Sequence, residues 1–129
     1  MAMAIFGVFL ILHGLVHLLY AGQCLRIFEL QPGMLWPDGS WAFSPILGNE
    51  TARSLALPLL VTTAIAFVVG GAGALLARPW WHMVVLSATV LSTIVFILYW
   101  DVAWQNLDDK GAIGIGINLA IVAAILLWF

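Results

Sequence analysis

Four long apolar runs occupy most of this chain and leave it few ways to fold. They cover roughly residues 4–24, 53–77, 80–100 and 111–129. A hydrocarbon layer about 30 Å thick needs roughly 20 apolar residues of helix to cross it, and each run is about that long. The runs are continuously apolar rather than alternating, which favours helices over membrane strands. They therefore predict an all-α integral membrane protein with four transmembrane helices.

The connections and the charged residues set the expected topology. Short segments join the second, third and fourth runs, and short connections make neighbouring helices antiparallel. We therefore expect residues 1–129 to form one domain, an up-down-up-down bundle in the cell membrane, with both termini on one side. The opposite side carries Arg26, Arg53 and Lys110, whereas Arg78 lies on the side of the termini. This excess favours a cytoplasmic position for the loop side, but the acids there leave the orientation open. Asp101 is a candidate ion-pair partner for Arg53 or Arg26.

Local signals predict where the second span begins and ends. Asn49 is a candidate N-cap for its helix, and Ser44-Pro45 predicts a separate short helical turn just before it. Pro79 disfavours helical backbone at the residues that precede it. The span is therefore expected to end near residue 78.

The loop at residues 25–52 is the longest segment outside the apolar runs. Trp36 and Trp41 flank a Pro-Asp-Gly turn, in which proline fixes one φ angle and glycine tolerates a positive one. One interpretation is that the two indoles anchor the loop against lipid headgroups or against each other. The other is that they form a docking surface or a lid.

Two histidines one helical turn apart are the sharpest local feature. His13 and His17 lie at positions i and i+4, so both project from one face of the first helix. Ionisable residues inside a membrane are costly and usually mark function, and this spacing suits metal chelation. One interpretation of the pair is therefore a metal site, a haem site or a quinone site. Cys24, Asp101 and His82 are poor additional ligands, because they are expected near the ends of the helices.

Polar side chains from all four runs fall at a similar expected depth. At 1.5 Å of rise per residue, they lie within about 3–6 Å of the midplane on the loop side. They could be interhelical hydrogen-bonding groups, or they could line a small polar cavity, with Asn118 as a further cofactor-binding candidate. The predicted polar layer consists of His17, Thr62, Thr63, Ser92, Thr93 and Asn118.

Small residues recur along the apolar runs and predict close helix packing, because no hydrophobic force drives helices together within lipid. They pack either within the bundle or against a partner subunit. The members are Gly7, Gly14 and Ala21, then Ala66, Gly70, Gly71, Gly73, Ala74 and Ala77, then Gly114 and Gly116.

The segment HGLVHLL at residues 13–19 resembles the opening of small bacterial four-helix membrane proteins with an HGxxH motif. YWD at residues 99–101, followed by a late helix with Asn118, is similar to their closing half. The expected topology also resembles that of DoxX-like proteins. These resemblances imply an architecture and no catalytic residue.

Three classes of function fit this sequence. The first is a non-catalytic accessory or structural subunit that packs against lipid and larger membrane partners, or against copies of itself. The second is a cofactor protein for electron or proton transfer through His13 and His17, and the third is a small oligomeric transporter or channel. The net charge of −2, without a basic run, argues against nucleic acid as a partner. No nucleophile, base and orienting residue are expected at matching depth, so a non-enzymatic role is favoured.

Overall fold

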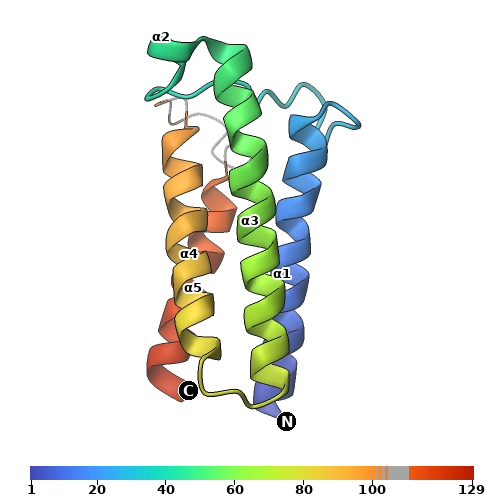
Figure 1. The fold of residues 1–129 in the computed structure, drawn as a ribbon, viewed down its shortest axis with the longest axis vertical. Helices are drawn as coiled ribbons and strands as arrows, with labels where there is room; N and C mark the ends of the chain where they lie inside the picture. Colours follow the sequence, from blue (N-terminus) through green and yellow to red (C-terminus); the bar gives the residue numbers. More distant parts are fainter. Residues whose placement is uncertain (101, 103, 105–110) are drawn as a thin grey trace.

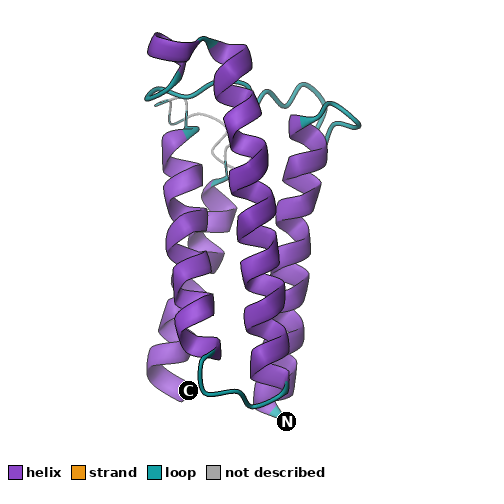
Figure 2. Cartoon of the chain, viewed as in Figure 1, coloured by secondary structure: helices purple, strands orange, loops and turns teal. Residues whose placement is uncertain are grey.

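The structure, a computed structural model, describes residues 1–100, 102, 104 and 111–129. Every regular element in this part of the chain is a helix. The long helices lie side by side, the 25–52 segment covers one end, and both termini lie at the other end (Figure 1). Figure 2 shows that the loops gather at the two ends. The helices are α1 (Ala2–Cys24), α2 (Ser44–Leu47), α3 (Asn49–Leu75), α4 (Trp81–Leu98) and α5 (Ala112–Trp128).

Three of the described helices, α1, α3 and α4, are long and apolar enough to cross a membrane. The predicted all-helical class is confirmed. Three of the four apolar runs form long apolar helices at about the predicted positions. The fourth run forms α5, an apolar helix of 17 residues, which is shorter than the other three.

The start of α3 differs from the prediction. The helix begins at Asn49, and its N-cap is Gly48, whose φ angle is 81°. No side chain caps this end, so the prediction that Asn49 caps the helix is wrong. A glycine serves here because its backbone adopts positive φ without a steric penalty. The short turn predicted at Ser44-Pro45 is confirmed as α2, with proline in its first turn.

The end of α3 is set by a backbone motif that comes before Pro79. The helix ends at Leu75, and the N–H of Arg78 donates to the carbonyl of Gly73 at 2.9 Å. Ala77 takes the left-handed conformation with φ at 52°. This pattern is a Schellman motif, which satisfies the last carbonyl groups of a helix.

Close packing of α1 against α3 depends on glycines. A Cβ atom on Gly14 would lie 2.9 Å from the carbonyl oxygen of Ala64, and one on Gly71 would lie 2.7 Å from that of Gly7. Both distances are too short for a real contact, so these positions confirm that small residues pack within the chain. Gly116 is different, because a Cβ atom there meets nothing within 4 Å. Along the sequence, α3 also packs against α4, and α4 against α5.

The buried apolar side chains form two clusters, one toward each end of the helices. The cluster at the loop end contains Ala21, Cys24, Met34, Trp36, Ala56, Leu60, Val95, Phe96 and Tyr99. The cluster toward the termini contains Leu10, Phe67, Ala74, Trp81, Val85, Ala88, Ile121 and Ile125.

The 25–52 segment is attached to the end of α4 by side-chain hydrogen bonds. The Ser40 hydroxyl donates to the carbonyl of Leu98, and the Trp41 indole N–H donates to the carbonyl of Ile97 at 2.8 Å. The last carbonyl groups of a helix have no partner within the helix. The segment therefore caps α4 from a distant part of the sequence.

Among the residues that the structure describes, one ion pair joins charged groups at this end. Arg26 forms an ion pair with Asp38 at 3.1 Å. Asp101, the predicted partner of Arg26 or Arg53, lies outside the described residues. The pairing of Arg26 therefore belongs to the loop itself.

Candidate functional site

Helix α1 turns both of its histidines toward the other helices. His13 and His17 are only 5% and 1% exposed. Leu15 and Val16, which lie between them in the sequence, are 44% and 39% exposed. Because side chains four residues apart share a helix face, one buried stripe of α1 carries both imidazoles.

The two histidines meet polar side chains from α4 and α5 in a buried hydrogen-bond network. His13 Nε2 lies 3.1 Å from Asn118 Oδ1, and His17 Nε2 lies 2.8 Å from Ser92 Oγ. Asn118 Nδ2 donates to Ser92 Oγ at 2.9 Å and to Thr93 Oγ1 at 3.0 Å. His17 Nδ1 lies 3.0 Å from the backbone carbonyl of His13. Three helices are joined at one level by these contacts.

The partners of His17 fix the positions of its protons. The carbonyl oxygen of His13 only accepts, so His17 Nδ1 carries hydrogen and donates to it. In the neutral imidazole the other nitrogen then accepts, and the Ser92 hydroxyl donates to it. His17 therefore uses both of its ring nitrogens within the network.

The orientation of the Asn118 amide follows from its threonine neighbour. The Thr93 hydroxyl donates to the carbonyl of Thr89 at 2.8 Å, so it accepts from Asn118 and faces the amide nitrogen. The amide oxygen therefore faces His13 and accepts from its Nε2–H.

These hydrogen bonds close into a ring. His13 donates to Asn118, Asn118 to Ser92, Ser92 to His17, and His17 to the carbonyl of His13. Buried polar groups are costly unless they are satisfied, and the ring satisfies all but one of these groups. The exception is His13 Nδ1, for which the described residues provide no hydrogen-bond partner, although it is not among the fully buried atoms that lack one.

Aromatic rings enclose the network. Phe67 packs on both histidines, with ring centroids 4.8 Å from His13 and 5.4 Å from His17. Phe9 stacks on His13 at 6.1 Å, and Phe96 lies 5.8 Å from His17. Phe67 belongs to one apolar cluster and Phe96 to the other, so the network lies between the two clusters. Sequence reasoning missed these phenylalanines, because apolar residues on apolar helices carry no distinguishing signal.

The predicted polar layer is brought together only in part. Thr62 is exposed and lies outside it. Thr63 is fully buried but donates to the carbonyl of Leu59 in its own helix at 2.7 Å. Thr89 was missed, although its position four residues before Thr93 was a usable signal. The members that meet are His17, Ser92, Thr93 and Asn118, joined by His13.

The other candidate ligands lie elsewhere. The Cys24 thiol donates to the carbonyl of Arg53 at 3.1 Å, and His82 stacks on Trp81 at 3.8 Å between ring centroids. Asp101 lies outside the described residues. Among the residues that the structure describes, no group of three or more His, Cys, Asp or Glu side chains is placed to hold a metal ion. Chelation by both histidines would also require His17 to leave its present partners.

The two loop tryptophans have separate positions. Trp36 is only 5% exposed and packs against Tyr20 and Phe96, with ring centroids 5.0 and 5.4 Å away. The expectation that it anchors the loop at the surface is therefore wrong, because the loop folds inward there. Trp41 is 52% exposed and holds the end of α4 through Ile97. Docking on Trp41 stays a prediction.

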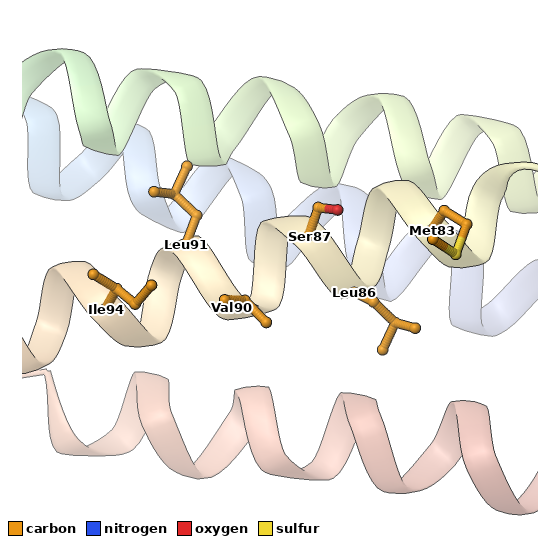
Figure 3. A pocket seen from close by; sticks show the side chains of 6 residues that line it. All are labelled: Met83, Leu86, Ser87, Val90, Leu91 and Ile94. Atoms are coloured by element: carbon orange, nitrogen blue, oxygen red, sulfur yellow. The ribbon is translucent and has the colours of Figure 1, made fainter.

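A groove of about 440 Å³ follows the outward side of α4. Figure 3 shows its side chains along that helix, with no other helix in front of them. Ser87 is an exposed hydroxyl residue on this otherwise apolar surface. The groove is lined by Met83, Leu86, Ser87, Val90, Leu91 and Ile94.

Comparison with protein-family models, curated proteins and solved structures gave no match for this chain. The class of protein is therefore defined by its fold and by the side chains of its site. It is an all-helical protein with three described helices able to cross a membrane and a buried histidine–asparagine–serine network.

Proposed function

We propose that the chain is an integral membrane protein in which α5 forms a fourth span and the helices alternate in direction. At 1.5 Å per residue, the 17 residues of α5 extend about 26 Å, close to the thickness of a thin hydrocarbon layer. Large apolar side chains are exposed along all four helices, as lipid contact requires. The shared end of the two termini (Figure 1) supports an up-down-up-down bundle.

Within the membrane, the chain acts as a non-catalytic accessory subunit that packs against a helix of a larger membrane protein. The observation that carries this proposal is the groove on α4. A hydroxyl and a hollow on a lipid-facing surface are features of membrane helix interfaces, where small and polar residues allow close approach. Met83 and Val90 are 70% and 59% exposed along it, so a partner helix would find an accessible surface.

The histidine network supports a structural role for the interior. Apart from His13 Nδ1, its side-chain donors and acceptors are used within the network, so chemistry at His17 would first have to break two hydrogen bonds. Interhelical hydrogen bonds of this kind fix which helix faces meet. We therefore expect this protein to act through contacts on its outer surface rather than through chemistry in its interior.

Filling the groove tests this role. The tagged chain and Val90→Trp are extracted from their own membranes in mild detergent, and the masses of the intact complexes are measured by native mass spectrometry. We expect the wild-type chain of 14.0 kDa to retain a larger protein, and Val90→Trp to lose most of it. Leu119→Trp is the control, because Leu119 is 67% exposed on α5, away from the groove.

Equal retention by Val90→Trp and Leu119→Trp would place any partner elsewhere and contradict the role of the groove. A lone wild-type chain would contradict the subunit proposal itself. Complexes whose mass is a multiple of the chain would instead make a second copy the occupant.

A second candidate function is favoured by one observation, the unpaired Nδ1 of His13. In the assigned tautomer this atom is an acceptor near the centre of the proposed span. A lipid-soluble hydroxyl compound, such as a quinol, would donate a hydrogen bond to it. The cofactor of this second candidate is therefore of the quinone class, in preference to a metal or haem.

Decylubiquinol provides the test of this candidate. Its binding to the purified chain is measured by titration, and His13→Phe is expected to weaken it about tenfold, the effect of one hydrogen bond worth roughly 1.4 kcal/mol. His82→Phe is the control, since His82 stacks on Trp81 away from the network. No binding by the wild-type chain would eliminate this candidate. A visible absorption band that His13→Phe abolishes would point to haem instead.

A further inference from the structure

Two side-chain nitrogens are fully buried without a hydrogen-bond partner among the described residues. They are Nε1 of Trp36 and one terminal guanidinium nitrogen, NH1, of Arg53. Both are donors. Buried polar atoms in native proteins nearly always have a partner, and an exception points to an ion or ligand.

Both residues lie at the loop end of the helices. Trp36 belongs to the apolar cluster there, and Arg53 precedes Ala56 of the same cluster by one helical turn. The backbone of Arg53 is fixed, because its carbonyl accepts from Cys24 at 3.1 Å. Arg53 as a whole is only partly buried, so part of the residue is accessible from outside.

No described acid neutralises Arg53. Asp38 is paired with Arg26 at 3.1 Å. Glu50 lies one turn before Arg53 on α3, and it is exposed and forms no ion pair with it. A guanidinium with a buried, unpaired nitrogen favours an oxyanion, to which it can donate two parallel hydrogen bonds.

The length of α3 places Arg53 at the depth of lipid headgroups in the proposed membrane orientation. The helix has 27 residues and extends about 40 Å, roughly 10 Å more than a hydrocarbon core. Arg53 lies in its second turn, about 6 Å along the axis from Asn49. Lipid phosphate groups occupy this layer.

We propose that Arg53 binds the phosphate of a phospholipid headgroup at the loop end of the helices. This site is separate from the α4 groove and the histidine network. It depends on membrane insertion, but not on any protein partner.

Lipid retention tests the site. The purified chain, delipidated and returned to detergent, receives phosphatidylglycerol, diacylglycerol or inorganic phosphate, and bound ligand is counted by native mass spectrometry. We expect phosphatidylglycerol to be retained and diacylglycerol not. Arg53→Gln should lower that retention about tenfold, as expected for the loss of a charge-assisted hydrogen bond.

Arg78→Gln is the matched control, because it removes the same charge from the opposite, exposed turn. Arg53→Lys should retain part of the binding, since it keeps the charge but not the bidentate geometry. Misfolding is excluded by melting temperature in lipid-free detergent, where Arg53→Gln should be at least as stable as wild type. The reason is that it removes a partly buried charge for which the described residues provide no acidic partner.

Equal phosphatidylglycerol retention by wild type, Arg53→Gln and Arg78→Gln would overturn the proposal. So would retention of diacylglycerol as strong as that of phosphatidylglycerol. Arg53-dependent binding of inorganic phosphate without retention of phosphatidylglycerol would keep the oxyanion chemistry and reject the lipid source. None of these outcomes depends on whether a protein partner occupies the groove.

Discussion

At the scale of single residues, the two histidines are not equivalent. His17 has a proton donor and a proton acceptor fixed by its neighbours, so its ring is fully used. His13 donates to Asn118 through Nε2 and keeps Nδ1 unpaired. Any ligand chemistry is therefore expected at His13, with His17 acting as part of its support.

Ser92→Ala should destabilise the chain by about 1 kcal/mol. The Ser92 hydroxyl accepts from Asn118 and donates to His17, and interhelical hydrogen bonds in membrane proteins average about 0.6 kcal/mol each. The measurement is reversible unfolding in mixed micelles. Ser87→Ala is the control on the same helix, because Ser87 lies on the outward groove. A loss no larger than that of Ser87→Ala would mean that the network does not stabilise the fold.

At the scale of helices, the distance between two neighbouring helix backbones decides which positions tolerate a residue larger than glycine. Gly7, Gly14 and Gly71 lie where α1 and α3 are in closest contact, whereas Gly116 has open space beside it. The sequence marks all of these as small residues. It does not distinguish those in contact from those that are free.

Gly71→Ala should destabilise the chain by about 1–3 kcal/mol, because the added methyl group would meet the backbone of Gly7 and neither helix can move without repacking. Gly116→Ala should have no effect or stabilise by up to about 1 kcal/mol, since alanine is the better helix former. Unfolding of both variants in the same micelles provides the comparison. Similar losses at the two sites would contradict the packing of α1 on α3.

At the scale of the whole molecule, the proposed bundle requires both termini on one side of the membrane. A reporter that is active only in the cytoplasm should therefore give the same result at the N-terminus and at the C-terminus. A reporter inserted after Gly33, which lies in the loop at the other end of the helices, should give the opposite result. Different results at the two termini would eliminate α5 as a fourth span.

Transport by an oligomer stays a prediction. His17 and Asn118 of the predicted polar layer are both buried inside a single chain.

The sequence by itself determined the helical class and the approximate limits of the apolar helices. A long apolar run in lipid has to satisfy its own backbone hydrogen bonds, and this requirement is local. It also indicated that His13 and His17 share a face and that Ser92, Thr93 and Asn118 lie at a similar depth, because helical rise and periodicity are fixed. The exact ends of α3 were not predictable, since they depend on Gly48 and on a backbone motif at Ala77.

Only the tertiary structure decided which polar groups meet. Depth along a helix does not give rotation about its axis, so Thr62 and Thr63 looked alike in the sequence although one is exposed and the other is fully buried. The inward position of Trp36 depends on a loop that folds back over the helices, and its contacts with Tyr20 and Phe96 join distant parts of the chain. Helix formation is a local property, whereas helix rotation and loop placement follow from the packing of all the elements together.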